Sequence, residues 1–247
     1  MEKRKETEPF TELEKSDLKG VTSKLFTVPG HEDIVVRKSF VNVPYEKREE
    51  WESKYANLSE EEKRKMMIYE RMEYLRNKAV EFKKIIDRLG IRMAKTDYVI
   101  GTDTKTDKPA LFGATERIEG KSLEEITLLD KDLAEKVDNL YAKIIIDLVE
   151  SYKKELYFWC DPQNSQFVYG KTEKDNKQDI YLVDVDPDIL NWKDVAMENK
   201  EHLFWNRLTC ILFEMEEAEG KTDEKGFRFK KAREAVEKAK TEIFDMI

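Results

Sequence analysis

Cysteine and histidine are scarce in this sequence. Its 247 residues include only two cysteines, Cys160 and Cys210, and two histidines, His31 and His202. The cysteines lie far apart and form no C-x-x-C pair, so a structural zinc site is not expected. Free thiols are typical of a reducing compartment, which favours a cytoplasmic protein.

Long apolar segments are also lacking. No stretch approaches the roughly 18 apolar residues that a membrane-spanning helix needs, and the first residues, MEKRKETEPF, lack the apolar core of a secretory signal. The 45 basic and 53 acidic residues give a net charge of −8, which argues against non-specific nucleic-acid binding as the main activity. We therefore expect neither a membrane nor a nucleic-acid partner.

The composition that is present suits a globular protein. Hydrophobic residues make up 40% of the chain, enough to build one large domain or two lobes that share a cleft. Charged residues also make up 40%, well above the roughly 25% typical of globular domains. Much of this charge is expected on the solvent-facing sides of long helices.

The first part of the chain predicts antiparallel strands. β-Branched runs flank the turn at 29–33, which predicts a β-hairpin within 20–40, either alone or preceded by one short strand. Residues 1–17 are highly charged and are interpreted as an arm or a short helix. Residues 41–58 are expected to be irregular because Pro44 interrupts any helix.

A long helix is predicted to begin after Ser59. The S-E-E-E segment combines an N-cap residue with an acidic first turn, and Gly90 is a typical helix end. Apolar residues recur in steps of four and three and define one helix face. These apolar positions are 68, 72, 75, 79, 82, 86 and 89.

The rest of the chain is mainly helical after a second hairpin. The order of hairpin, helix, hairpin and then helices separates antiparallel strands from most of the helices, which indicates an α+β fold rather than a parallel sheet. The predicted elements are hairpin strands at 98–101 and 110–115, a helix at 131–155, an irregular stretch at 158–170, a strand at 180–184, and helices at 193–217 and 224–245.

Two carboxylates follow a buried strand of apolar residues. Asp184 comes directly after Ile-Tyr-Leu-Val, and Asp186 points to the same side because strand side chains repeat every two residues. Carboxylate oxygens are ligands that Mg²⁺ favours. Asp-x-Asp-Pro is also ordinary turn chemistry, so a plain turn remains an alternative.

Three motifs in this order resemble the aminoglycoside phosphotransferase family, whose members have a protein-kinase-like, two-lobed fold. They are I-V-V-R-K at 34–38, L-F-G-A-T-E-R-I-E-G-K-S-L at 111–123, and W-C-D-P-Q-N-S-Q-F-V-Y at 159–169 followed by I-Y-L-V-D. The resemblance covers residues 20–190. It implies a lobe with a small antiparallel sheet and a helix, a mostly helical second lobe, and ATP and Mg²⁺ as cofactors. The implied parts are an arm at 1–17, a nucleotide-binding lobe at 18–118 and a helical lobe at 119–247.

The resemblance assigns a catalytic role to Asp161. The family motif is H-G-D-x-x-x-x-N, and Asp161 matches its catalytic Asp. Trp159 replaces the His, and Gln166 replaces the Asn, while Asn164 lies two residues early. Gln166 keeps an amide oxygen, so Gln166 and Asp184 are the implied Mg²⁺ ligands. A simple Asp-Pro turn at a helix end is the alternative interpretation of Asp161.

The hinge between the lobes is implied at 116–123. Glu116 and Ile118 match the family's hinge positions, where backbone groups bind adenine, and Gly120 and Leu123 match the turn into the next helix. A strand followed by a turn and the capping pattern Ser122-Leu-Glu-Glu is the alternative.

The phosphate-binding residues are implied by the first hairpin. Lys38 would contact the phosphates and pair with a Glu of the long helix, Glu81 by position, with Glu73 and Glu70 as alternatives. Val36 shares the face of Lys38 and would cover adenine. A solvent-exposed Lys at a strand end remains possible.

The phosphate-covering loop is implied at Gly20-Val-Thr-Ser, where Ser23 would contact the phosphates.

Two functions follow from these motifs. One is an ATP-dependent phosphotransferase that binds nucleotide and acts on the hydroxyl of an unknown small-molecule or protein acceptor. The other is a pseudokinase, a nucleotide-binding or protein-interaction module, which the replacements at Trp159 and Gln166 motivate.

Overall fold

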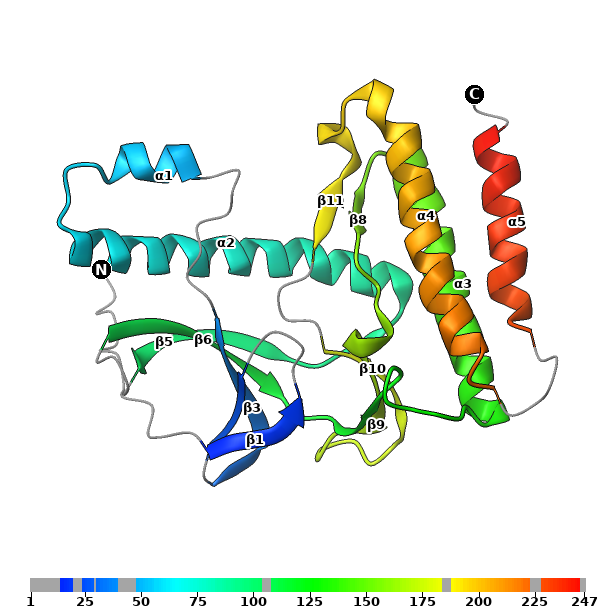
Figure 1. Ribbon diagram of the computed structural model, residues 1–247, viewed down its shortest axis with the longest axis horizontal. Helices are drawn as coiled ribbons and strands as arrows, with labels where there is room; N and C mark the ends of the chain where they lie inside the picture. The colour runs from blue at the N-terminus through cyan, green and yellow to red at the C-terminus, as the bar shows by residue number, and fades with distance from the viewer. Residues whose placement is uncertain are drawn as a thin grey trace. The chain divides into compact units, whose positions relative to one another are not determined.

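A computed structural model describes residues 14–19, 24–28, 30–39, 48–103, 108–183, 188–222 and 228–244 (Figure 1). The chain forms two compact units. Unit 1 comprises Met1–Asn77 and Ala94–Arg117, and unit 2 comprises Lys78–Met93 and Ile118–Ile247. Both units combine strands with helices, so the fold is mixed α+β with small, mainly antiparallel sheets.

Unit 1 is built on a five-stranded antiparallel sheet. Both predicted hairpins are present, and Gly30, with φ of +80°, adopts the left-handed conformation that glycine tolerates in the turn between β2 and β3. The last strand, β6, lies between β3 and β5. The strands are β1 (Glu14–Lys19), β2 (Lys24–Val28), β3 (His31–Ser39), β5 (Thr96–Asp103) and β6 (Lys108–Glu116), in the order β1-β2-β3-β6-β5.

Two elements of unit 1 differ from the sequence predictions. β1 overlaps the end of the segment 1–17 that is expected to be an arm or a short helix, and it pairs with β2, so the first hairpin is preceded by a strand, as one of the two alternatives has it. Helix α1 (Arg48–Lys54) occupies a segment expected to be irregular. α1 is fixed to α2 (Glu60–Leu89) by its C-terminal end, since Lys54 and the buried Tyr55 both donate hydrogen bonds to Glu70.

Helix α2 begins where the sequence predicts it. Ser59 and Glu62 form a capping box, in which the Glu62 N–H donates to Ser59 Oγ at 3.4 Å and the Ser59 N–H donates to Glu62 Oε2 at 3.0 Å. The predicted apolar face is largely buried. Its first part packs in unit 1 against Tyr98 and Leu111, and its last part enters the core of unit 2 through Phe82, Ile85, Ile86 and Leu89.

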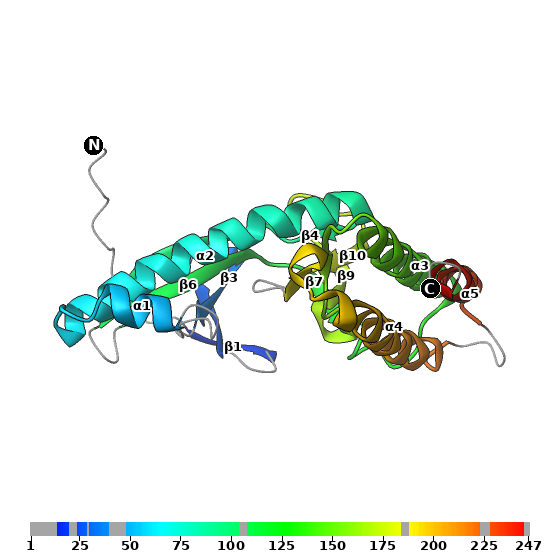
Figure 2. The same ribbon diagram turned by 90° about the horizontal axis from the view of Figure 1, so that it is seen from above.

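Unit 2 is mostly helical. α3 (Lys131–Lys153) is its central helix and contacts both α4 (Met197–Glu219) and α5 (Lys230–Phe244) (Figures 1 and 2). Two small sheets complete it. One has the order β4 (Arg92–Met93), β10 (Asp179–Leu182), β9 (Phe167–Lys171) and β7 (Glu119–Ser122), and the other pairs β8 (Tyr157–Trp159) with β11 (Ile189–Asn191).

The N-terminus of α5 is capped by carboxylates from the other two helices. Asp138 of α3 is buried and accepts hydrogen bonds from the N–H groups of Lys231 and Ala232 at 3.1 and 2.8 Å. Glu219 of α4 is also buried and accepts one from the Phe229 N–H at 2.5 Å. Three N–H donors at the start of α5 are therefore satisfied by carboxylates of α3 and α4.

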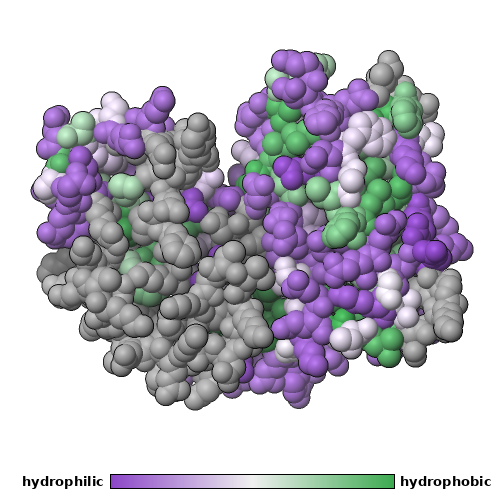
Figure 3. Space-filling view, in the orientation of Figure 1, coloured by the Kyte–Doolittle hydropathy of each residue, from purple (hydrophilic) through white to green (hydrophobic). Residues whose placement is uncertain are grey.

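One face of unit 2 is mainly polar. Figure 3 shows hydrophilic residues over most of the described face of unit 2, with smaller hydrophobic patches between them. In the part of the chain that the structure describes, no helix is both long enough and apolar enough to cross a membrane.

Candidate active site

Residues 160–166, called here the Asp161 loop, connect β8 to β9 in unit 2. The loop begins after the buried Trp159, and the Cys160 N–H donates to the Asp188 carbonyl at 2.8 Å. The Asp161 carboxylate is partly exposed and accepts a hydrogen bond from Gln163 Nε2 at 2.8 Å. The Gln163 N–H donates to the Asp161 carbonyl at 3.0 Å, which closes a tight turn. The turn leaves the predicted catalytic carboxylate partly open to solvent.

The β9–β10 hairpin returns the chain to the end of this loop. β9 and β10 pair from Gly170 and Asp179 to Phe167 and Leu182. One step further, the Val183 N–H donates to the Gln166 carbonyl at 2.9 Å. Gln166 therefore lies beside the residue that precedes Asp184 in the chain.

The predicted metal ligands are only partly described. Asp184 and Asp186 lie outside the described residues. Gln166 is partly exposed, and its Oε1 accepts a long, 3.4 Å hydrogen bond from the Gln163 N–H. Within the described ranges, no three His, Cys, Asp or Glu side chains are grouped as a metal site. The Gln166 amide is an oxygen donor of the kind that Mg²⁺ accepts.

Asn164 has a structural place that the sequence does not reveal. It is 1% exposed and lies in the short 3₁₀ helix η2 (Asn164–Gln166). Its N–H donates to Glu214 Oε2 at 2.7 Å, and its Nδ2 donates to the Glu214 carbonyl at 2.9 Å. Its Oδ1 accepts a hydrogen bond from the buried Tyr141 hydroxyl at 2.8 Å. Because these groups are already bonded, Asn164 does not replace the family's Asn as a metal ligand.

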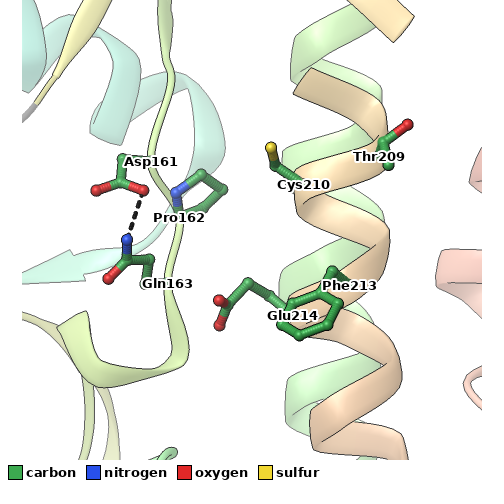
Figure 4. A pocket seen from close by; sticks show the side chains of 7 residues that line it. All are labelled: Asp161, Pro162, Gln163, Thr209, Cys210, Phe213 and Glu214. Atoms are coloured by element: carbon green, nitrogen blue, oxygen red, sulfur yellow. Dashed lines mark hydrogen bonds between the residues drawn. The ribbon is translucent and has the colours of Figure 1, made fainter. Parts of the chain in front are cut away.

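A pocket lies between the Asp161 loop and α4 (Figure 4). Its volume is about 370 Å³. In Figure 4 the Glu214 side chain extends from α4 toward the loop, and Asp161 is joined to Gln163 by the hydrogen bond described above. We call it the Asp161 pocket. Its lining residues are Asp161, Pro162, Gln163, Thr209, Cys210, Phe213 and Glu214.

The electrostatics of the Asp161 pocket are dominated by negative charge. Burial raises the pKa of Glu214 above its usual value, and the charges of Glu217, Asp161 and Glu124 raise it further against the opposing hydrogen bond from Asn164. Burial also raises the pKa of the Cys160 thiol to about 12. Cys160 is therefore protonated at neutral pH and is no nucleophile.

Trp159 is a core residue in this fold. It is 1% exposed, and its ring makes edge contacts with Phe82 and Phe167 at centroid distances of 5.6 and 5.5 Å. Its indole N–H finds no hydrogen-bond acceptor among the residues that the structure describes. The residue that replaces the family's His thus contributes apolar packing beneath the loop.

The predicted hinge is an extended segment. The Glu116 N–H donates to the Lys95 carbonyl at 2.8 Å, the Arg117 N–H donates to the Asp33 carbonyl at 2.7 Å, and Glu116 and Ile118 are partly buried. After it, β7 pairs with β9, and Gly120 lies opposite Gly170.

Gly120 lies so close to β9 that a side chain has no room. A Cβ on Gly120 would lie 2.2 Å from the Tyr169 carbonyl oxygen, which explains a glycine at this position. The capping pattern at Ser122 is formed with Glu125, but it closes a turn and not a helix. The next helix, α3, begins only at Lys131.

The predicted phosphate-binding residues are placed in part. Val36 is buried with Ala110 and Phe112, in a cluster that contains no α2 residue. Lys38 pairs with Phe112 through the β3–β6 register, while its side chain and Ser23 lie outside the described residues.

Glu81, the predicted acidic partner of Lys38, is paired with a lysine of its own helix. Glu81 forms an ion pair with Lys84 at 2.7 Å. Its pairing with Lys38 stays a prediction.

Comparisons with known proteins add little to the site. No protein-family model matches the sequence, and no curated protein matches it. Among solved structures, the chain is similar to one described as "WaaP in complex with acyl carrier protein". The two share 10% sequence identity, the likeness covers 96% of this chain and 88% of that chain, and the TM-score is 0.33. A TM-score this low carries no argument, so function has to be inferred from the residues of this chain.

Proposed function

We propose that this protein is an ATP-dependent phosphotransferase with a protein-kinase-like fold that acts on a hydroxyl acceptor. The observation that carries the proposal is the path of the chain around Asp161. The loop that bears Asp161 leads into the β9–β10 hairpin, and the hairpin returns Val183 to a 2.9 Å hydrogen bond with Gln166. The catalytic Asp, the amide and the metal-binding Asp of the family are expected along such a path.

The order of elements in unit 1 supports the nucleotide-binding part of the proposal. Kinases carry a phosphate-binding Lys on the third strand, before a helix whose Glu pairs with it. Here Lys38 lies on the third strand, α2 follows, and β6 lies beside β3 before it enters the segment at 116–118. In the proposal, backbone groups at 116–118 bind adenine, and Val36 contacts its ring.

The chemistry of transfer assigns one role to each group. The acceptor hydroxyl oxygen attacks the γ-phosphorus of ATP, and the bond from that phosphorus to the bridging oxygen breaks to release ADP. Asp161 orients the hydroxyl and takes its proton. Asp184 and Gln166 would hold Mg²⁺, which offsets the phosphate charge when bound. Lys38 would position the α- and β-phosphates.

A nucleotide-binding and turnover assay tests this function. The expected result is a thermal shift with ATP that requires Mg²⁺, together with ATP turnover. Asp161→Asn should abolish turnover and keep the shift, while Asp184→Asn should weaken the Mg²⁺-dependent shift. Asp132→Asn is the matched control, since Asp132 is an exposed carboxylate of α3. Wild-type protein with neither shift nor turnover would refute the proposal.

The second candidate function is a pseudokinase. Two observations favour it: Trp159 is buried in the core where the family has His, and the Gln166 amide oxygen already accepts a hydrogen bond, although a long one, from Gln163. The expected result for this function is weak or absent nucleotide binding and no phosphate transfer. Transfer of phosphate to any acceptor would exclude it.

A further inference from the structure

We propose that Tyr141, Asn164 and Glu214 are positioning residues that hold the Asp161 loop against α3 and α4 and so set the place of Asp161 for phosphoryl transfer. This inference rests on the proposed phosphotransferase function. None of the three residues belongs to the family motif that identifies Asp161, and none is proposed to contact the nucleotide.

The contacts of Asn164 make it the centre of this network. It lies three residues after Asp161, and its side chain and backbone N–H make three hydrogen bonds of 2.7, 2.8 and 2.9 Å to Tyr141 and Glu214. Its carbonyl accepts a further one from the Phe167 N–H. An Asn side chain carries a donor NH₂ group and an acceptor oxygen, and here each of the two has a partner on a different helix.

The burial of the network gives these bonds their weight. Tyr141 is 0% exposed and Asn164 is 1% exposed, so water cannot replace a lost partner at either side chain. Buried polar networks of this kind fix one conformation because each unsatisfied group is costly. The loop is therefore held at its 3₁₀ turn while its Asp161 end stays partly exposed.

The position of Glu214 links this network, called here the anchor of the loop, to the Asp161 pocket. Its carboxylate accepts the Asn164 N–H, and it also lines the pocket together with Asp161. A shift of about 1 Å in a catalytic group is enough to lower turnover by roughly a hundredfold. Loss of the anchor is therefore expected to lower kcat more than it changes the KM for ATP.

Isosteric variants test the network with little change in volume. Asn164→Asp replaces the amide donor by an oxygen that faces the Glu214 carbonyl, and Tyr141→Phe removes only the hydroxyl. Glu214→Gln keeps an oxygen that can accept the Asn164 N–H and serves as the conservative rescue. Tyr152→Phe is the control on the same helix, because the Tyr152 ring contacts Trp192 and Phe204 and the substitution keeps that ring.

Two measurements are made on each variant: kcat and KM for ATP turnover with Mg²⁺, and amide hydrogen exchange of peptides that cover 158–167. For Asn164→Asp we expect kcat to fall at least about tenfold with the KM for ATP within about twofold. Exchange at 160–166 should be faster in Asn164→Asp and Tyr141→Phe, and unchanged in α5. Glu214→Gln and Tyr152→Phe should retain the wild-type exchange of the loop.

The exchange measurement separates failure of this inference from failure of the proposed function. Unchanged loop exchange in both Tyr141→Phe and Asn164→Asp overturns the positioning role, whatever the turnover. If Asn164→Asp does not fold, Tyr141→Phe decides alone, because it removes a single oxygen. Absence of wild-type turnover, with faster exchange confined to the loop in the variants, overturns the phosphotransferase function and leaves the anchor in place.

Discussion

Two buried tryptophans of unit 2 allow a direct test of the environment of Trp159. Trp159 and Trp192 are 1% and 0% exposed. The indole N–H of Trp192 donates to Ser151 Oγ at 3.1 Å, whereas that of Trp159 has no acceptor among the described residues. Trp→Phe at each position removes a similar amount of buried apolar surface, so the two substitutions differ mainly in the N–H group.

The magnitude follows from the hydrogen-bond terms. At Trp192 the substitution loses a net hydrogen bond, worth about 1 kcal/mol. At Trp159 the substitution removes an N–H donor that is buried without an acceptor among the described residues. Because this donor lost its hydration on folding and gained no partner, its removal should raise the free energy of unfolding by roughly 1–3 kcal/mol. The lost apolar area costs about 1 kcal/mol at either site. We therefore expect Trp192→Phe to lower the free energy of unfolding by about 2–4 kcal/mol more than Trp159→Phe.

Urea unfolding followed by far-UV circular dichroism measures this difference, since that signal comes mainly from the backbone. Both residues belong to unit 2, so the same transition reports on both. Equal losses of stability would refute the reasoning, because they would mean that the Trp159 N–H has an acceptor of its own.

Three further substitutions have defined outcomes. Gly120→Ala places a Cβ 2.2 Å from a backbone carbonyl oxygen and should lower the free energy of unfolding by more than about 2 kcal/mol in urea unfolding. Gly113→Ala is the control, because the nearest atom to its Cβ is at 3.8 Å, and it should lower this free energy by less than about 1 kcal/mol. Equal losses would contradict the close approach of β7 and β9. Asp138→Ala leaves two N–H groups of α5 without an acceptor and should lower the free energy of unfolding by about 1–3 kcal/mol. Asp138→Asn keeps one acceptor oxygen and should lower it less. A melting temperature of Asp138→Ala within one degree of wild type would refute the capping role. The raised pKa of Glu214 means that the folded state binds its proton more tightly than the unfolded state, so ionisation removes stability as the pH rises from the ordinary value of 4.5 through the raised one. Glu214→Gln should therefore be more stable, relative to wild type, at pH 7 than at pH 4 in urea unfolding; the reverse order would show that the carboxylate is stabilised by folding.

Much of the fold follows from local sequence signals. The turn at Gly30, the capping pair of Ser59 and Glu62 and the apolar steps along α2 each specify an element without help from the rest of the chain. α3 follows from its apolar stripe, and its N-cap Asp130 accepts the Leu133 N–H at 2.9 Å. These elements were predicted correctly because their main determinants lie within a few residues of one another.

The elements that were missed depend on distant partners. β8 has three residues and pairs with β11 through Ile189↔Trp159 to Asn191↔Tyr157, at least 30 residues further along the chain, so neither strand has a local pattern of its own. α1 depends on the contacts of its C-terminal end with Glu70 of α2. Short segments of this kind are stable only in the folded unit, and their sequences alone read as irregular.

The candidate site also combines a local sequence signal with contacts between distant residues. The motif at Asp161 identified the loop, but the roles of Asn164 and Glu214 come from contacts 50 residues apart. One signal was available: Tyr141 lies in the predicted apolar stripe, and a buried Tyr hydroxyl usually needs a partner. The identity of that partner required the fold.

The capping of α5 by Asp138 and Glu219 makes the last helix part of a cooperative assembly. α5 has 15 residues, close to the length at which isolated helices are marginal in water, and its first-turn acceptors belong to α3 and α4. Removal of α5 would leave both carboxylates without their N–H donors as well as uncovering apolar residues of α3. A fragment that ends at residue 222 is therefore expected to be less stable than its lost apolar area alone would suggest, and protease-resistant fragments of unit 2 should retain all three helices together.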